Sequence, residues 1–293
     1  SARVMDAALR SLLVSEHFLD SRSLPSASWG MGWDRNQSVR DRRLRDVVEA
    51  TRANLELLRA RHRGINQLLE DLEALGPIAV VGGAVRDWST GRPPRDLDLA
   101  VDTPASSLRA LIARTRSRDA TRTRLGGWCL RVDQRKIDLW SLPDSWGFKR
   151  EPSLEPTFGN LAATAFFNVD AVVVELRRRK AYCAGFHEAF QRRILDIRFD
   201  TLPVDLDVTA AARSLVLASE HRFQPSPRLP RFLRSLSAER ALWPLVQEDH
   251  QRRYGEILVP LHAARSMLQP WPDLLTTFFG PGERASATHP RAA

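Results

Sequence analysis

The 293-residue chain has few cysteines and no long apolar run. Its two cysteines, Cys129 and Cys183, are too few for a disulfide framework or a cysteine-based zinc site, and we expect two buried thiols in a reducing compartment. A membrane-spanning helix needs about 18 or more consecutive apolar residues, and the sequence has no such stretch. The first residues also lack the basic-then-apolar pattern of a secretory signal. We therefore expect a cytoplasmic protein without a membrane partner.

Lysine is also scarce, and arginine supplies nearly all of the positive charge. Lys136, Lys149 and Lys180 are the only lysines among 44 basic residues, and the net charge is +9. A positive balance favours a polyanionic partner. The planar guanidinium group of arginine donates hydrogen bonds that match the oxygens of a phosphate. The composition therefore favours a nucleic acid as the partner.

Two adjacent glycines follow a short apolar segment in the first third of the chain. Residues 77–81 predict a buried strand, and residues 84–89 predict a helix. Between them, Gly82 and Gly83 permit a sharp turn and let a ligand approach the backbone closely. The first N–H groups of the following helix favour an anion at the same place. This pattern indicates a phosphate-binding turn, although a Gly-Gly pair alone is often only a turn.

Two carboxylates follow the glycines at a spacing of two residues. Residues 96–101 predict a second strand, so the side chains of Asp96 and Asp98 project from the same face. Carboxylates held so close repel each other unless a hard cation lies between them, and Mg²⁺ is the usual one. An isolated Asp-x-Asp is often a solvated strand edge. A phosphate-binding turn that faces two metal-binding carboxylates, however, is typical of nucleotidyl transfer.

The order of these motifs resembles the head domain of the class II tRNA nucleotidyltransferase and bacterial poly(A) polymerase family, within the polymerase-β-like nucleotidyltransferase superfamily. The family signature is Gly-Gly-x-Val-Arg-Asp, then Gly-Arg, then Asp-x-Asp, and residues 82–87, 91–92 and 96–98 match it. The resemblance extends from about residue 65 to about residue 235 and is strongest up to residue 101. It implies an α+β fold, in which a small mixed-sheet nucleotidyltransferase head is followed by an all-helical neck.

The resemblance and the helical spacing together divide the chain into four parts. We expect an N-terminal helical extension over 1–64, the head over 65–185, the neck and body over 186–279, and a disordered tail over 280–293. Residues 1–60 are open to two interpretations, a docking surface for a protein partner or a helical cap that stabilises the fold.

Several local elements are also predicted. Ser38 is a candidate helix cap, and Gly64 a candidate break between two helices. The alternation in residues 128–142 predicts two strands with Gly126 and Gly127 as the turn, and residues 168–176 predict another strand.

A third carboxylate is expected on a neighbouring strand. Asp138 lies in a strand-like segment, and it also matches the corresponding segment of the family. Asp133 is the weaker alternative, because five residues away on a regular strand it would face the opposite side. By resemblance, Asp96, Asp98 and Asp138 would hold one Mg²⁺, and Asp96 and Asp98 would hold a second.

The same resemblance implies residues for nucleotide binding. The amides of Gly82 and Gly83 would bind the β- and γ-phosphates. Arg86 would either neutralise the triphosphate or brace the loop by pairing with Asp87. Arg92 and Arg95 flank the carboxylates, and we expect one of them to reach a phosphate.

Two family motifs are incomplete. Of the motif Arg-Arg-Asp-Phe-Thr-x-Asn, aligned with residues 162–168, only Asn168 is present. Of the neck motif Glu-Asp-x-x-Arg-x-x-Arg, which reads the incoming base in the family, Asp207 and Arg213 are present, and Ala210 replaces the middle arginine. Arg213 would contact a base or phosphate, or form a salt bridge on the helix surface. The nucleotide preference is therefore left open.

The leading hypothesis is a Mg²⁺-dependent nucleotidyltransferase. It would transfer a nucleoside monophosphate from an NTP, with ATP or CTP favoured, to an RNA 3′ hydroxyl, with tRNA the favoured acceptor, and would release pyrophosphate. One alternative is the same chemistry on a protein or small-molecule hydroxyl. Another is a catalytically silent RNA-binding scaffold, which the paired carboxylates disfavour.

Overall fold

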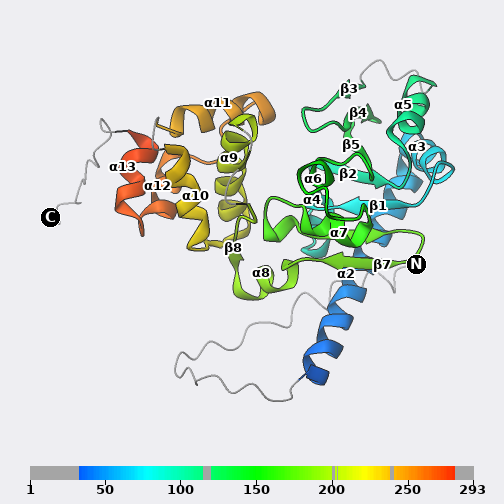
Figure 1. The fold of residues 1–293 in the computed structure, drawn as a ribbon, viewed down its shortest axis with the longest axis horizontal. Helices are drawn as coiled ribbons and strands as arrows, with labels where there is room; N and C mark the ends of the chain where they lie inside the picture. The colour runs from blue at the N-terminus through cyan, green and yellow to red at the C-terminus, as the bar shows by residue number, and fades with distance from the viewer. Residues whose placement is uncertain (1–32, 115–119, 200–201, 203, 238–240, 281–293) are drawn as a thin grey trace. The chain divides into compact units, whose positions relative to one another are not determined.

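The computed structural model describes residues 33–114, 120–199, 202, 204–237 and 241–280, and Figure 1 shows their arrangement. The chain divides into units 1–37 and 38–293. Of the first unit, only the start of a helix belongs to the described part. The predictions for residues 1–32 and 281–293, including most of the tail, lie outside the described residues. None of the described helices is long and apolar enough to cross a membrane.

Two helices, α2 (Trp33–Arg61) and α3 (Arg63–Glu73), precede the sheet. The predicted break near Gly64 is confirmed, since the two helices part at His62. The prediction that Ser38 caps a helix is wrong, because Ser38 lies inside α2.

The central sheet has seven strands in the order β3-β4-β5-β2-β1-β6-β7. Only the pair of β2 and β5 is parallel among the pairs of this sheet, so the sheet is mixed, as predicted. The strands are β1 (Ile78–Val81), β2 (Asp96–Val101), β3 (Thr121–Arg122), β4 (Trp128–Val132), β5 (Arg135–Ser141), β6 (Val172–Glu175) and β7 (Lys180–Cys183).

Two predictions about the strands need correction. Gly126 and Gly127 lie between β3 and β4, and the turn that joins β4 to β5 is formed by Asp133 and Gln134. Both of these have positive φ, 48° and 65°, which is uncommon outside glycine. The strand predicted from residue 168 begins instead with a single 3₁₀ turn, η1 (Asn168–Asp170), and continues as β6.

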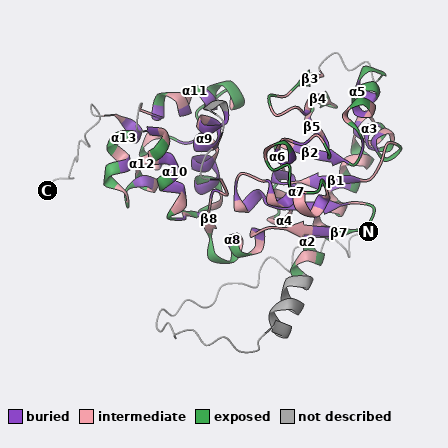
Figure 2. Cartoon of the chain, viewed as in Figure 1, coloured by how far each residue is buried: buried purple, intermediate pink, exposed green. Residues whose placement is uncertain are grey.

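The two faces of the sheet have different surroundings. On β2, Leu97 and Leu99 point into a core that also contains Leu55 of α2, Leu69 of α3 and Ile112 of α5 (Ala105–Arg114). Residues of the opposite face, such as Ala100, pack with α6 (Trp146–Arg150) and α7 (Phe158–Ala163). Figure 2 shows the buried strands between these helices. Asp96 and Asp98 alternate with the leucines, so they belong to the face of α6 and α7.

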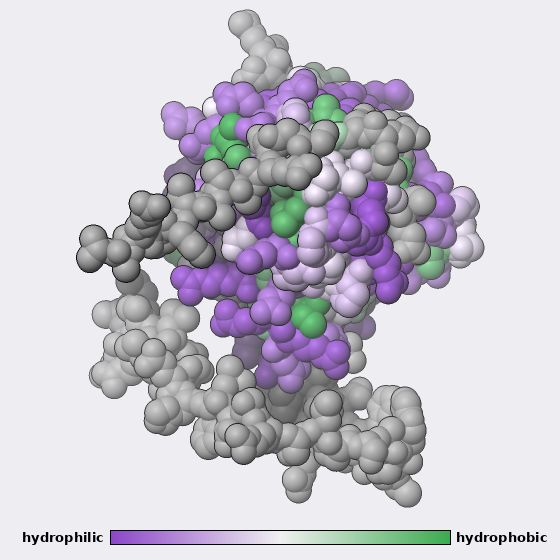
Figure 3. All heavy atoms as spheres, turned by 90° about the vertical axis from the view of Figure 1, so that its left-hand side faces the viewer, coloured by the Kyte–Doolittle hydropathy of each residue, from purple (hydrophilic) through white to green (hydrophobic). Residues whose placement is uncertain are grey.

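A second core lies in the helical C-terminal part. Its central helix is α9, which is rich in buried alanine and leucine. The helices are α8 (Phe186–Arg192), α9 (Val204–His221), α10 (Arg228–Ser237), α11 (Trp243–Tyr254), α12 (Leu261–Leu268) and α13 (Pro272–Phe279). A short parallel pair, β8 (Ile194–Leu195) and β9 (Gln224–Pro225), accompanies the helices. The described residues on the face in Figure 3 are mostly hydrophilic, with small separate hydrophobic patches.

The two cysteines are free, and neither is fully buried. Cys129 and Cys183 are both half-buried. The prediction of two free thiols is thus confirmed, but the expectation that both are buried is wrong.

Candidate active site

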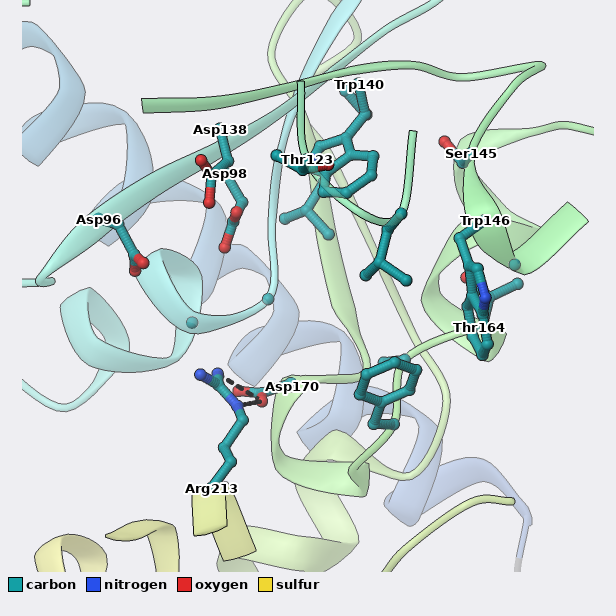
Figure 4. A pocket seen from close by; sticks show the side chains of 18 of the residues that line it. Asp96, Asp98, Thr123, Asp138, Trp140, Ser145, Trp146, Thr164, Asp170 and Arg213 are labelled. Carbon is teal, nitrogen blue, oxygen red and sulfur yellow. Dashed lines mark hydrogen bonds and ion pairs between the residues drawn. The ribbon is translucent and has the colours of Figure 1, made fainter. Parts of the chain in front are cut away.

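Three carboxylates line one wall of a cavity of about 410 Å³. The parallel register of β2 and β5 places Asp98 directly opposite Asp138, and Asp96 opposite Lys136. Because side chains on a strand alternate, Asp96, Asp98 and Asp138 all project from the same face. Figure 4 shows the three carboxylates together at one side of the cavity.

The carboxylates are in contact with two basic side chains. The Nζ of Lys136 lies 2.6 Å from Oδ2 of Asp138 and 3.2 Å from Oδ2 of Asp96. The Nη2 of Arg95 donates to the same oxygen of Asp96 at 3.0 Å. Burial disfavours the charged form of Asp96, but the charges of Arg95, Lys136 and Arg213 outweigh it and lower the pKa of Asp96 to about 2.

Asp98 has the opposite electrostatic environment. Burial, and then the negative charges of Asp96 and Asp138, raise the pKa of Asp98 to about 8. The buried Oδ1 of Asp138 has no hydrogen-bond partner among the described residues. Within that part of the chain, no group of three or more His, Cys, Asp or Glu side chains is already arranged as a metal site. Negative charge is thus concentrated on this wall and is only partly neutralised.

The glycine turn lies at the same cavity but offers fewer donors than predicted. Gly82 has a φ of 62°, which favours glycine, and its N–H donates to the Val172 carbonyl at 2.9 Å. The amide of Gly82 is therefore already used within the sheet, contrary to the predicted phosphate contact. Gly83 also lines the cavity. A Cβ atom at Gly83 would meet only the ends of two arginine side chains, at 3.6 Å.

Arg86 is part of a buried ion-pair network. Its Nε donates to Asp87 at 2.8 Å, and its Nη1 pairs with Asp170. Arg213 donates to the other oxygen of Asp170, at 3.1 Å from Nε and 2.8 Å from Nη2. Burial opposes ionisation of Asp170, but the two guanidinium groups outweigh it and lower its pKa. Of the two interpretations of Arg86, the structure has the arrangement that braces the loop, and Arg86 does not line the cavity.

Three other predicted residues, Arg92, Asn168 and Asp207, lie outside the cavity lining. Arg92 is exposed, and its backbone N–H donates to the Asp87 carbonyl. The side chain of Asn168 holds the chain after α8, since it donates to the Ile194 carbonyl and accepts from the Asp196 amide, both at 2.9 Å. Asn168 thus has a structural role here. Of the two arginines that flank the carboxylates, only Arg95 lines the cavity.

One face of α9 closes the cavity on the helical side. Leu206, Thr209 and Arg213 line it, at the three- and four-residue spacing of a helix face. Asp207 and Ala210 are 6% and 0% exposed and do not line it. Of the neck-motif residues in this chain, only Arg213 therefore reaches the cavity.

Several cavity residues were missed by the sequence reasoning. Lys136 and Trp140 stand two positions before and after Asp138, and strand alternation could have found them. Asp170 and Arg253 come from distant segments without a local signal. Asp133, the rejected third carboxylate, accepts hydrogen bonds from the Gly64 and Ile65 amides at 2.8 and 3.1 Å and so caps the first turn of α3.

The end of the cavity away from the carboxylates is aromatic. Trp140, Trp146 and Phe166 line it, and the rings of Trp146 and Phe166 meet edge to face at 4.9 Å. Figure 4 shows Trp140 and Trp146 away from the acidic side chains. The cavity thus has one charged end and one apolar end.

Comparison with known proteins agrees with this arrangement. Residues 78–141 match the model of the poly A polymerase head domain. This segment contains the glycine turn and all three carboxylates. This part of the chain is therefore similar to a poly A polymerase head domain. A search of curated proteins finds no match.

Among solved structures, the fold is similar to that of CCA-adding enzymes. For the Thermotoga maritima CCA-adding enzyme complexed with tRNA, the TM-score is 0.54 at 16% identity, covering 75% of this chain and 54% of that one. For a CCA-adding enzyme in apo form I, the values are 0.56 and 20%, covering 79% and 56%. For a CCA-adding enzyme with ATP, they are 0.52 and 17%, covering 75% and 54%. The chain thus spans little more than half the length of these enzymes.

Proposed function

We propose that the protein is a Mg²⁺-dependent nucleotidyltransferase. It transfers a nucleoside monophosphate from an NTP to an RNA 3′ hydroxyl, with tRNA the favoured acceptor, and releases pyrophosphate. The observation that carries the proposal is the parallel register of β2 and β5, which brings Asp98 beside Asp138 on the wall shared with Asp96 and Gly83.

The charge of this wall fits a divalent cation. Burial and the like charges around Asp98 raise its pKa, and a bound cation would stabilise the ionised carboxylates. Carboxylate oxygens are the ligands that Mg²⁺ prefers. Asp96, Asp98 and Asp138 would hold the metal ions, which supply charge neutralisation at the phosphates and a lowered pKa of the attacking hydroxyl.

The remaining cavity residues suit the other parts of an NTP. Gly83 has no side chain, so phosphates can approach the backbone there. Arg95 and Arg213 place positive charge beside the carboxylates. The aromatic end offers ring faces for a base and excludes water from the site.

The comparisons support the choice of substrates. The similar solved structures include a CCA-adding enzyme with CTP, another with ATP, and one complexed with tRNA. The arginine-rich composition also favours an RNA acceptor. A cytoplasmic location remains a prediction.

A transfer assay tests the proposal directly. The full chain is incubated with Mg²⁺, total RNA and each α-labelled NTP in turn, beside an Asp96→Ala/Asp98→Ala control. We expect label on tRNA-sized RNA, and none with the control protein. Equal labelling by the control would contradict the proposal.

A second candidate is the same chemistry on a protein or small-molecule hydroxyl. Ala210, which stands where the family has a base-reading arginine, favours it, because the neck motif departs from that of the tRNA enzymes. Absence of label on RNA, with NTP binding still measurable, would support this candidate over an RNA acceptor.

A further inference from the structure

The side of the cavity formed by α9 and α11 is called the helical wall, and the side formed by the strands of the sheet and the glycine turn is called the head wall. Besides Arg213, the helical wall contains a second arginine that is held by a buried carboxylate. Arg253, near the end of α11, lines the cavity. Its Nε lies 3.1 Å from Oδ1 and 3.0 Å from Oδ2 of Asp249, and its Nη2 donates to Oγ1 of Thr209 at 3.0 Å. The Thr209 hydroxyl in turn donates to Asp249 at 3.2 Å. The network fixes the direction of the guanidinium group.

The carboxylate of this network is buried, whereas the arginine is partly exposed to the cavity. The side chain of Asp249 is 2% exposed, whereas that of Arg253 is 36% exposed. The preceding residue, Arg252, pairs with the same carboxylate but is 58% exposed and does not line the cavity. Two adjacent arginines thus share one buried carboxylate, and only one of them faces the site.

This arrangement suits directional hydrogen bonding more than charge neutralisation. Asp249, which also pairs with Arg252, offsets part of the positive charge of Arg253. A guanidinium group has five N–H donors, and the bonds to Asp249 and Thr209 use one on Nε and one on Nη2. The terminal nitrogens can therefore present a parallel pair of donors, one from each. Under the proposed function, the triphosphate would lie at Gly83 and at the metal ions held by the carboxylates, on the head wall.

We propose that Arg253 reads the base of the incoming nucleotide, in place of the arginine missing at Ala210. This inference rests on the proposed function. A parallel pair of donors matches a base edge with two neighbouring acceptors, which are N3 and O2 of cytosine or N7 and O6 of guanine. Adenine and uracil place a donor beside each acceptor on the equivalent edges. CTP and GTP are thus preferred over ATP and UTP.

Two matched substitutions test the proposal. Arg253→Lys keeps the charge but removes the paired donors, and Arg252→Lys makes the same change on the neighbour outside the cavity. Affinities of the full chain for all four NTPs are measured with Mg²⁺, together with thermal unfolding of each protein. We expect the wild type to bind CTP and GTP about 10- to 100-fold more tightly than ATP and UTP. Arg253→Lys loses this preference, and Arg252→Lys keeps it.

A third variant is expected to change the nucleotide preference to a different base, which a misfolded protein would not do. Glutamine pairs with adenine through one donor and one acceptor, so Arg253→Gln shifts the preference towards ATP. A preference unchanged in both Arg253 variants, or a wild type that favours ATP or UTP, overturns the inference.

Parallel transfer assays separate this inference from the proposed function. If Arg253→Lys still transfers nucleotides with an unchanged preference, the inference is wrong and the proposed function stands. If the nucleotides bind in the expected order of affinity but none is transferred to any acceptor, the proposed function is wrong and the inference stands.

Discussion

The two walls of the cavity treat charge in opposite ways. The head wall brings Asp96, Asp98 and Asp138 together, and burial, followed by the repulsion from Asp96 and Asp138, raises the pKa of Asp98. The helical wall pairs each of its arginines with a buried carboxylate, Arg213 with Asp170 and Arg253 with Asp249. The difference supports the proposed placement of metal ions and phosphates at the head wall, whereas the helical wall offers fixed hydrogen-bond donors.

The largest expected effect is a loss of transfer activity when a carboxylate of the head wall is replaced. Asp98→Asn removes a carboxylate that would hold the metal ions. Transfer is expected to fall about a thousandfold, which corresponds to the several kcal/mol that a metal ion supplies. Stability in EDTA should not fall, because the change removes the cost of burying a carboxylate beside Asp96 and Asp138. Single-turnover assays and urea unfolding measure the two effects. Equal losses of activity and stability would show that Asp98 is structural.

The second largest expected effect is a loss of stability, from the ion pairs that Asp170 forms with Arg86 and Arg213. Asp170→Ala leaves the buried guanidinium of Arg86 and the neighbouring Arg213 without their shared carboxylate, at a cost of about 3–5 kcal/mol in the free energy of unfolding. The control is Asp273→Ala, which breaks an exposed pair with Arg234 and should cost less than about 1 kcal/mol. Similar losses in urea unfolding for both variants would mean that the network is not a buried structural element.

A third effect depends on pH and concerns His221, at the end of α9. Burial, then the charges of Arg86 and Arg92, lower its pKa from 6.5 to about 4. Between these values only the unfolded chain takes up the proton, so stability falls as pH drops from about 6.5 to 4, by at most about 1.4 kcal/mol per unit.

His221→Phe should remove this part of the pH dependence. Urea unfolding at several pH values gives the difference between the two proteins. A difference that stays constant from pH 7 to pH 4 would show that His221 titrates alike in both states.

The smallest expected effects come from alanine substitutions at the two glycines of the turn, and they differ between the two positions. Gly83→Ala meets only flexible arginine ends, so it should leave the melting temperature unchanged and weaken NTP binding about tenfold by hindering the phosphates. Gly82→Ala should instead cost about 1–2 kcal/mol of stability, because its φ is positive. Calorimetry and thermal unfolding distinguish them. An unchanged NTP affinity in Gly83→Ala would place the triphosphate elsewhere.

Much of the head could be predicted because its signals are local. The apolar segment at 77–81 and the alternation at 96–101 predicted β1 and β2 closely. The alternation around Asp138 placed it on the correct face. The turn at Asp133 and Gln134 was missed because neither residue is glycine despite positive φ.

The helical wall was harder to predict, because its site residues depend on long-range packing. Asp170 and Arg213 are 43 residues apart, and Thr209 and Arg253 are 44 apart. Nothing near either pair indicates the contact. The rotation of α9, which turns Asp207 away from the cavity and Thr209 towards it, also follows from packing against α11 and not from the motif.

The contact between Asp133 and α3 has a mechanical consequence. Asp133 forms the tip of the hairpin whose second strand carries Asp138, and its carboxylate grips the first turn of α3. The hairpin is therefore tethered at its tip, and Gln134 and the first three residues of β5 connect this tether to the third carboxylate. A displacement of α3 would therefore pull on the turn at Asp133 and, through β5, on Asp138, so α3 can act as a lever on the third carboxylate.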